Sequence, residues 1–318
     1  MQQQAVLAID IGGTKLAVGV VDEEGRVLET RRAPNPNPPA GDGEAVLRAL
    51  LALIDELETD RAELIGVGVG CGGPMHWPSG EVSPLNIPSW RDYPLRDRLA
   101  EEFGLPVHIH NDAVCVAVAE HWRGAGMGAD DVLGMVVSTG VGGGLILGGR
   151  LINGATGNAG HIGHAIVHEF EPQCRCGAIG CLEAIASGPN LSAWAHGQGW
   201  REGHSPEQRT GQDLVDDARR GDAIALTAMR RAGRALGIGI ATATTLCDLQ
   251  VVAIGGGFSQ AGPLLFDPLE ASLRERIGLE YARAVRVVPA GLGQESGLVG
   301  AAALILRPDR YWSADDKD

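Results

Sequence analysis

The stretch Asp10-Ile11-Gly12-Gly13-Thr14-Lys15 separates two short apolar segments, residues 5–9 and 16–21, that have the composition of β-strands. Its two glycines predict a tight turn between these strands. Backbone N–H groups in a glycine turn can bind phosphate oxygens, and the Thr14 hydroxyl and the Lys15 ammonium would add a donor and a positive charge. Asp10 is a candidate ligand for Mg²⁺, because this ion binds few carboxylates and keeps several waters. The alternative is an ordinary hairpin turn.

A second glycine-rich stretch, Ser138-Thr139-Gly140-Val141-Gly142-Gly143-Gly144, is also expected to form a turn between two strands. In both places a third short strand follows after another turn. A meander that occurs twice predicts two related domains. Thr139 and Gly140 would correspond to the first turn, and the two turns could bind one nucleotide from two domains.

The rest of the chain alternates between helical and strand patterns, which predicts an α/β fold. We expect one domain over residues 1–112, completed by a C-terminal helix at about 296–318, and a second domain over residues 113–295. Small ligands favour the cleft between two such domains. The expected helices are 44–57, 95–103, 113–122, 213–219, 223–245, 263–277 and 296–306, and further strands are expected at 64–69, 107–109, 251–254 and 285–288.

The dipeptide Asn111-Asp112 lies between an expected strand and the helix that begins at Ala113. Asp112 is a candidate general base, because phosphoryl transfer needs a carboxylate that accepts the proton of the attacking hydroxyl. Either residue could instead serve as the N-cap of the helix.

Three cysteines and one histidine lie close together in the sequence, at His164, Cys174, Cys176 and Cys181. A Cys₃His set is typical of closed tetrahedral zinc, which is structural because no coordination position stays open to water. Zinc would hold in place the loop that carries His161 and Glu183. A chance cluster of thiols or a redox role is the alternative.

Composition narrows the class of partner and compartment. The formal net charge of −14 disfavours nucleic-acid binding, which needs clustered Lys and Arg. The longest uncharged stretch, residues 132–149, is broken by glycines and predicts strands and turns instead of a membrane helix. The N-terminus has no secretion-signal pattern, and six cysteines in 318 residues do not suggest a disulfide scaffold. We expect a cytoplasmic protein that binds neither nucleic acid nor membrane.

Taken together, these segments resemble the ROK family of sugar kinases and sugar-responsive repressors. The matching segments follow one another in the order of the family. They are DIGGTK at 10–15, NDA at 111–113, STGVGGG at 138–144, AGHIGH at 159–164, CRCGAIGCLE at 174–183 and IGGG at 254–257.

The resemblance implies an actin-like ATPase (ribonuclease H-like) fold, with two α/β domains around a cleft and a zinc-bearing loop in the second. It implies ATP and Mg²⁺ as cofactors beside structural Zn²⁺, and a homodimer or homotetramer. Asp112 would be the base for the 6-hydroxyl of the sugar. The phosphates and Mg²⁺ would be surrounded by Asp10, Gly12, Gly13, Thr14, Lys15, Thr139 and Gly140, and the adenosine would lie near Gly255, Gly256 and Gly257. The sugar would contact Asn86, Asn111, Asp112, His164 and Glu183.

One residue departs from the pattern of the family's glucokinases, which usually carry Glu where this chain has His161. A neutral imidazole offers one acceptor nitrogen and no fixed charge, so the contacts near C1 and C2 of the sugar would differ. The AGHIGH form resembles bacterial N-acetylmannosamine kinases, whereas residues 84–90 with Asp92 resemble a glucokinase segment. A tolerated change at His161 with unchanged specificity is the alternative.

The expected function is ATP-dependent phosphorylation of the 6-hydroxyl of a hexose, first of all glucose. The alternative within the same class is an N-acetylmannosamine kinase. An alternative of another class is a non-catalytic sugar sensor or repressor. Because the first phosphate turn begins at residue 10 of an acidic chain, we expect no DNA-binding domain before it.

Overall fold

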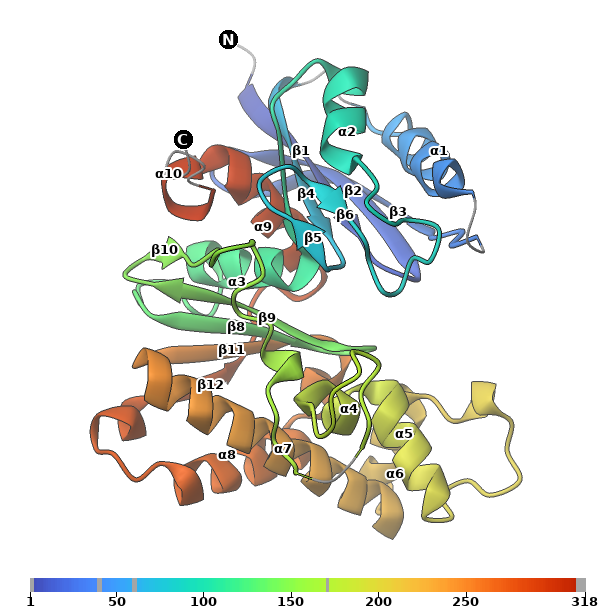
Figure 1. The fold of residues 1–318 in the computed structure, drawn as a ribbon, viewed down its shortest axis with the longest axis vertical. Helices are drawn as coiled ribbons and strands as arrows, with labels where there is room; N and C mark the ends of the chain where they lie inside the picture. The colour runs from blue at the N-terminus through green and yellow to red at the C-terminus, as the bar shows by residue number, and fades with distance from the viewer. Residues whose placement is uncertain (1–2, 39–41, 59–61, 170–171, 313–318) are drawn as a thin grey trace. The chain divides into compact units, whose positions relative to one another are not determined.

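The computed structural model describes residues 3–38, 42–58, 62–169 and 172–312. It divides into two compact units, each built around one five-stranded sheet with helices packed on it (Figure 1). The first unit comprises residues 1–128, 144–159 and 292–318, and the second comprises residues 129–143 and 160–291. These bounds differ from the expected boundary between residues 112 and 113, which stays a prediction.

The first sheet has the strand order β3-β2-β1-β4-β7. Strands β1 (Gln3–Ile11), β2 (Lys15–Asp22) and β3 (Val27–Pro34) form an antiparallel meander. Strands β4 (Ala62–Cys71) and β7 (Val107–Asn111) run parallel to β1. The parallel register pairs Ile11 with Cys71 and Cys71 with Asn111, so the three strands end side by side. This shared edge positions the residues that follow each strand.

Helices cover both faces of the first sheet. One face packs on α1 (Gly43–Ile54) and α2 (Leu95–Phe103), which share a single apolar core with β1, β2, β4 and β7. The other face packs on α3 (Asp112–Arg123) and α9 (Ser296–Leu306).

Glycines let α9 approach its neighbours closely. A Cβ at Gly68 of β4 would lie 2.0 Å from the carbonyl oxygen of Ala301, and one at Gly300 would lie 1.7 Å from that of Cys115. The backbones therefore touch where any side chain would clash. A short helix, α10 (Pro308–Tyr311), ends the described chain, and residues 313–318 of the expected C-terminal helix lie outside the described residues.

The second sheet repeats the order of the first, as β10-β9-β8-β11-β12. Strands β8 (Val132–Val137), β9 (Val141–Leu147) and β10 (Arg150–Leu151) form the meander, and β11 (Val251–Gly255) and β12 (Arg286–Pro289) add parallel strands. The repeated meander expected from the sequence is confirmed.

The second glycine turn is shorter than expected, because β9 already begins at Val141. Two of its glycines serve close packing within the strand. A Cβ at Gly143 would lie 2.9 Å from the carbonyl oxygen of Gly134, and one at Gly144 would lie 2.8 Å from Cβ of Ala117. Glycine is therefore needed at both positions for reasons other than turning the chain.

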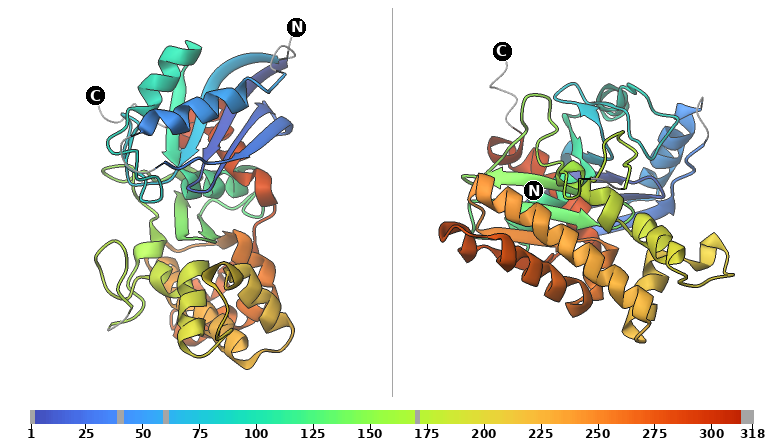
Figure 2. Two further views of the ribbon diagram at one scale, coloured as in Figure 1. Left: turned by 90° about the vertical axis from the view of Figure 1, so that its right-hand side faces the viewer. Right: turned by 60° about the horizontal axis from the view of Figure 1, so that its bottom comes forward.

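The helices of the second unit pack around α7 (Ala223–Cys247) and α8 (Pro263–Arg276), which lie side by side (Figure 2). A Cβ at Gly237 of α7 would lie 2.6 Å from Cβ of Ser272, so this glycine permits the close crossing. Helices α4 (Leu182–Ala186), α5 (Gly188–Gly197) and α6 (Gly211–Arg219) complete the unit. Of these, only α6 was expected from the sequence.

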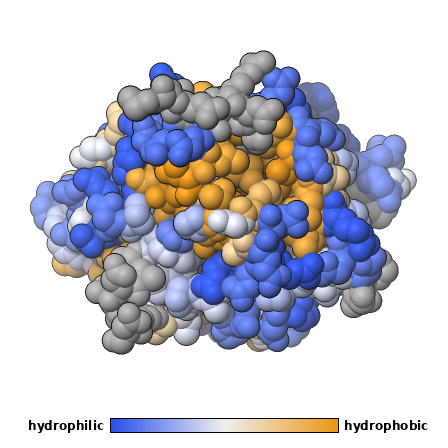
Figure 3. Space-filling model, turned by 90° about the horizontal axis from the view of Figure 1, so that it is seen from above, coloured by the Kyte–Doolittle hydropathy of each residue, from blue (hydrophilic) through white to orange (hydrophobic). Residues whose placement is uncertain are grey.

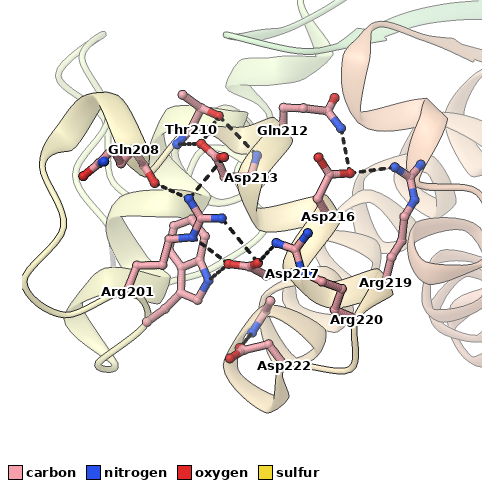
Figure 4. A network of polar contacts seen from close by, with 12 residues as sticks. Arg201, Gln208, Thr210, Gln212, Asp213, Asp216, Asp217, Arg219, Arg220 and Asp222 are labelled. Carbon is pink, nitrogen blue, oxygen red and sulfur yellow. Dashed lines mark hydrogen bonds and ion pairs between the residues drawn. The ribbon is translucent and has the colours of Figure 1, made fainter.

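An ionic network ties the segment before α6 to that helix (Figure 4). The Arg201 guanidinium donates to the Asp217 carboxylate at 2.7 Å and is paired with Asp213 at 3.1 Å. The indole N–H of the buried Trp200 donates to Asp217 at 2.9 Å. Arg220 adds a further ion pair with Asp217. These donors hold the pKa of Asp217 at about 2, chiefly through the hydrogen bond from Arg201.

Two further observations concern the apolar residues, one on their place on the surface and one on the apolarity of the helices. Apolar residues gather in the middle of the face seen from above, bordered by polar residues (Figure 3). Within the described residues, no helix combines the length and the apolarity that a membrane-spanning helix needs.

Candidate active site and metal centre

The first glycine turn connects β1 to β2 and is closed by a hydrogen bond from the Gly12 N–H to the Lys15 carbonyl at 2.9 Å. Asn86 lies directly against it, since a Cβ at Gly13 would be 2.7 Å from Cβ of Asn86. A phosphate-binding candidate and a sugar-binding candidate are therefore in contact within the first unit.

Two carboxylates flank the end of β4. Asp10 of β1 pairs with Gly70 of β4, and a Cβ at Gly70 would lie 3.5 Å from Cα of Asp112. Burial and the charge of Asp112 raise the pKa of Asp10 to about 7, although Lys15 and Arg32 act to lower it. Asp10 is partly exposed as a residue, but its carboxyl group is surrounded by protein atoms.

This donor set fits a magnesium ion. Hard divalent cations bind carboxylate oxygens. Two neighbouring carboxylates repel each other, and a bound cation would offset this repulsion. The Oδ2 atom of Asp10 also lies against the first turn of α9, since a Cβ at Gly297 would be 2.5 Å from it. Asp10 would be the carboxylate that holds the ion.

Asn111 is the N-cap of α3, and Asp112 is the first residue of this helix. The Ala113 N–H donates to Oδ1 of Asn111 at 3.0 Å and to Oδ1 of Asp112 at 2.8 Å. The capping alternative is thus correct for this helix. It does not compete with a role for Asp112 in catalysis, because a capped first turn also fixes the direction of the carboxylate.

His110 accepts a hydrogen bond from the backbone of Asn111. It was not among the site residues expected from the sequence. Its Nδ1 atom accepts the N–H of Asn111 at 2.8 Å, so the proton of a neutral ring is on Nε2. That nitrogen lies 2.9 Å from Oδ1 of Asn153 and donates to it. His110 is almost fully buried, and no spacing pattern distinguishes it from a core residue.

The second glycine turn is held by Glu183 of α4. Its Oε2 atom accepts the N–H of Val141 at 2.9 Å, and a Cβ at Gly140 would lie 2.7 Å from the same oxygen. The turn also binds to α5, because the Gly188 N–H donates to the Ser138 carbonyl at 2.8 Å. A sugar-binding candidate thus supports the turn that carries Thr139.

The glycine run after β11 lies against the end of β8. Gly256 has a left-handed φ of 89°, and a Cβ there would lie 2.4 Å from the carbonyl oxygen of Val137. Gly255 and Gly257 flank it. The run therefore adjoins the second glycine turn, which begins directly after Val137.

The four predicted zinc ligands come together in space. The ligand atoms of His164, Cys174, Cys176 and Cys181 all lie within 4.8 Å of one another. The Cys174 Sγ atom is 3.7 Å from Nδ1 of His164, and the Cys176 and Cys181 sulfurs are 3.6 Å apart. Edges of about 3.5–3.8 Å are those of a tetrahedron with zinc-to-ligand bonds of about 2.0–2.3 Å. The residues fit a closed zinc site.

This cluster adjoins two sugar-binding candidates. The imidazole of His161 stacks on that of His164, with ring centroids 6.4 Å apart. Glu183 follows Cys181 by two residues, and the Leu182 N–H donates to the Ala165 carbonyl at 2.9 Å. Burial raises the pKa of the Cys181 thiol to about 12. A metal that binds there must therefore displace a proton.

The chain matches the model of the ROK family over residues 6–307. It belongs to the ROK family. Among its relatives, the glucokinase of Thermotoga maritima is 34% identical over 316 residues, covering 96% of this chain and 98% of the relative. The N-acetylmannosamine kinase of Yersinia pestis is 34% identical over 296 residues, covering 93% and 96%.

Solved structures of the ROK family agree with the fold. A glucokinase from Streptomyces griseus in complex with glucose and AMPPNP has a TM-score of 0.83 and 36% identity, covering 94% of this chain and 98% of that one. A ROK hexokinase from Thermus thermophilus has a TM-score of 0.78 and 35% identity, covering 94% and 96%. The expected actin-like ATPase fold is confirmed.

The expected site residues fall into two groups, one in each unit. Those at the shared strand edge of the first unit are Asp10, Gly12, Gly13, Thr14, Lys15, Asn86, Asn111 and Asp112. Those of the second unit are Thr139, Gly140, His161, His164, Glu183, Gly255, Gly256 and Gly257, together with the cysteines. Their individual roles stay proposals.

Proposed function

We propose that this ROK-family chain is an ATP-dependent kinase that phosphorylates the 6-hydroxyl of a hexose, with glucose as its preferred substrate. The observation that carries the proposal is the pair Asp10 and Asp112 beside the Gly12-Gly13 turn, at one edge of the first sheet. The glucokinases to which the chain is similar along almost its whole length support it.

Each group of this site has a distinct task in phosphoryl transfer. Asp112 would accept the proton of the attacking 6-hydroxyl. The hydroxyl oxygen would form a bond to the γ-phosphorus of ATP, while the bond from this phosphorus to the oxygen that bridges to the β-phosphate breaks. Backbone N–H groups of the two glycine turns, with the Lys15 ammonium, would bind phosphate oxygens. Mg²⁺ held through Asp10 would neutralise phosphate charge.

The titration of Asp10 matters for this role. With a pKa near 7 the carboxyl group is only partly ionised at neutral pH before a cation binds. A divalent cation would favour the ionised form, because an opposite charge nearby lowers the pKa of a carboxyl group. Cation binding at Asp10 would therefore release protons and tighten as the pH rises from 6 to 8.

We further propose that zinc at His164, Cys174, Cys176 and Cys181 is structural. All four protein ligands are present, so the ion would have no open position for substrate or water. The ring contact of His164 with His161 and the position of Glu183 two residues after Cys181 support a role in shaping the sugar pocket.

For the identity of the sugar substrate we retain a second candidate. His161 stands at the start of the short helix η2 (Ile162–His164), beside the zinc ligand His164. Its imidazole cannot supply the fixed negative charge of the Glu that is usual in the family's glucokinases. This difference, with the 34% identity to N-acetylmannosamine kinases, supports an N-acetylmannosamine kinase as the alternative substrate class.

A coupled assay of ADP release with ATP and Mg²⁺ tests these proposals across glucose, mannose, fructose, N-acetylglucosamine and N-acetylmannosamine. We expect the highest kcat/KM with glucose. Preference for N-acetylmannosamine would establish the alternative. Turnover on none of the sugars, with sugar binding retained in calorimetry, would favour a non-catalytic sensor and overturn the kinase proposal.

Two variants sharpen the assay. Asp112→Asn should keep sugar binding while kcat falls by about 10²–10⁴-fold, the usual effect of losing a general base; near-normal kcat would remove Asp112 from that role. His161→Glu should raise the ratio of kcat/KM for glucose over N-acetylmannosamine. An unchanged ratio would make His161 a tolerated substitution.

We also propose a cytoplasmic homodimer or homotetramer. All six cysteines are free, and thiols of this kind persist in a reducing compartment. Sedimentation equilibrium would test the oligomeric state, and a monomer at all concentrations would contradict it.

A further inference from the structure

Three successive carbonyl groups of the first glycine turn are held by two asparagines that follow β3. The side-chain amide of Asn35 donates to the Gly12 carbonyl at 2.7 Å, and that of Asn37 donates to the Gly13 carbonyl at 3.1 Å. The backbone N–H of Asn35 donates to the Thr14 carbonyl at 3.0 Å. The two asparagines therefore clamp the carbonyl groups of the turn.

This clamp determines where the N–H groups of the turn point. In a planar trans peptide the carbonyl and the N–H of the next residue point in opposite directions. When the carbonyls of Gly12 and Gly13 face the asparagines, the N–H groups of Gly13 and Thr14 must face the opposite side. That is the side on which a glycine turn can bind an anion.

Asn37 makes a second contact that Asn35 does not. Its side-chain amide also donates to the backbone carbonyl of Asn86 at 2.9 Å. Since the Asn86 side chain lies against Gly13, the amide of Asn37 ties the phosphate-binding candidate to the sugar-binding candidate. The Asn37 side chain thus contacts both segments.

The two asparagines are themselves well fixed. Asn35 is buried, with 8% exposure, and its Oδ1 atom accepts the N–H of Asn37 at 2.9 Å. Asn37 has a left-handed φ of 38°, which asparagine adopts more readily than most residues. Prolines at 34, 36 and 38 restrict the backbone between and beside them.

We propose that Asn35 and Asn37 are positioning residues for phosphoryl transfer. Asn35 orients the phosphate-binding turn and makes no contact with the Asn86 segment among the hydrogen bonds of the described residues, whereas Asn37 orients the turn and couples it to that segment, which is proposed to face the sugar. Binding of the sugar then strengthens binding of the nucleotide through Asn37, and by linkage the reverse. The inference rests on the kinase function proposed above and adds two residues and a coupling to it.

Calorimetry with Mg-AMPPNP and glucose, each alone and each in the presence of the other, tests the proposal in the whole chain. Asn35→Ala should weaken Mg-AMPPNP by about tenfold, the loss of roughly one buried hydrogen bond, while the glucose Kd stays within about twofold of wild type. Asn37→Gly should weaken Mg-AMPPNP by about tenfold and also reduce the factor by which one ligand tightens the other to nearly one. Glycine is chosen because it keeps the left-handed backbone without strain.

Controls separate positioning from folding. Asp248→Gly replaces another left-handed residue, with φ 52° at the end of α7, and should leave both Kd values and the coupling factor unchanged. Asn37→Asp keeps the shape of the side chain but puts a carboxylate against two carbonyl oxygens. It should lower affinity and coupling at least as much as Asn37→Gly, and it carries the test if the glycine variant does not fold.

The outcomes distinguish this inference from the function on which it rests. Wild-type protein that binds neither Mg-AMPPNP nor a sugar would overturn the kinase proposal. Wild type that shows coupling, together with an Asn37→Gly variant that keeps the same coupling factor, would overturn the role of Asn37. Unchanged nucleotide affinity in Asn35→Ala would overturn the clamp.

Discussion

The Oε2 atom of Glu183 accepts a hydrogen bond from the backbone N–H of Val141 at 2.9 Å. A residue expected to contact the sugar therefore also supports the second glycine turn. A carboxylate that accepts a backbone N–H can bind its ligand and hold the turn at the same time, because each oxygen has two acceptor sites.

The two tasks of Glu183 can be separated by the choice of substitution. Glu183→Gln retains an oxygen that accepts the Val141 N–H, so Mg-AMPPNP affinity without sugar should stay within about twofold of wild type. Glu183→Ala loses the acceptor and should weaken Mg-AMPPNP by about tenfold, as expected for one charge-assisted hydrogen bond. Isothermal calorimetry on sugar-free protein measures both. Unchanged Mg-AMPPNP affinity in Glu183→Ala would restrict Glu183 to sugar binding.

The short approach of Gly297 to Asp10 gives a second prediction. Gly297→Ala would put a Cβ 2.5 Å from the Asp10 carboxylate, while alanine by itself favours the helix. We expect a thermal midpoint close to wild type but an apparent Mg²⁺ affinity at least tenfold weaker, from steady-state kinetics at varied Mg²⁺. Gly197→Ala is the matched control, since a Cβ at this helical glycine meets no atom within 4 Å. Unchanged Mg²⁺ dependence in Gly297→Ala would remove Asp10 from the metal site.

The raised pKa of Asp10 makes a prediction about stability. Between a pKa of 3.8 when unfolded and about 7 when folded, the native state binds more protons, so the free energy of unfolding falls as the pH rises through this range. Asp10→Asn has no carboxyl group at this position and does not lose stability in this way. Its free energy of unfolding relative to that of wild type should therefore rise by on the order of 2–4 kcal/mol between pH 5 and pH 8.

Urea unfolding in magnesium-free buffer measures this difference. A chelator must be avoided, because it would also remove zinc from the proposed Cys₃His site. A stability difference between Asp10→Asn and wild type that is the same at both pH values would show that Asp10 is already ionised in the native protein.

Loss of one zinc ligand should destabilise the second unit. Cys176→Ala should reduce bound zinc to well below one ion per chain and lower the thermal midpoint, because structural zinc contributes folding free energy. Cys247→Ala removes a thiol outside the cluster and should keep both values. Zinc content by plasma emission spectrometry gives the decision, and one tightly held ion in Cys176→Ala would exclude the proposed ligand set.

From the lowered pKa of Asp217 we predict a contribution to the free energy of unfolding that is lost at acid pH. With a folded pKa of about 2 against 3.8 when unfolded, Asp217 stabilises the native state above pH 4 and loses this effect as the pH falls toward 2. Asp217→Asn should cost on the order of 1–2 kcal/mol at pH 7 and less at pH 3. Asp216→Asn, which removes a more exposed partner of Arg219, should cost little at either pH. Equal losses for the two variants would contradict the central place of Asp217.

Local patterns in the sequence predicted much of this molecule. The turn at Gly12-Gly13, the Cys174–Cys181 cluster and the strand that precedes Asn111 are each encoded within a few residues, so spacing and residue type were sufficient. The repeated meander was predictable for the same reason, because each copy is local.

What the sequence did not reveal depends on contacts between distant residues. Asn37 is 24 residues from Gly13 and 49 from Asn86, and its hydrogen bonds follow from sheet order instead of spacing. His110 reads as a core position in a strand, and its partner Asn153 is 43 residues away. Helix α5 was missed because it carries glycines and a proline and has no clear apolar stripe.

The close contact of α9 with β4 and α3 has a consequence for how the protein is made. During translation α9 leaves the ribosome only after all five strands of the first sheet, so the part of the sheet face where Gly68 meets α9 stays uncovered until α9 has been made. The second unit, whose residues all lie before residue 292, can complete its core earlier. The first unit to begin is therefore the last to finish, and a nascent chain that stops short of Ser296 would display an apolar sheet surface to chaperones.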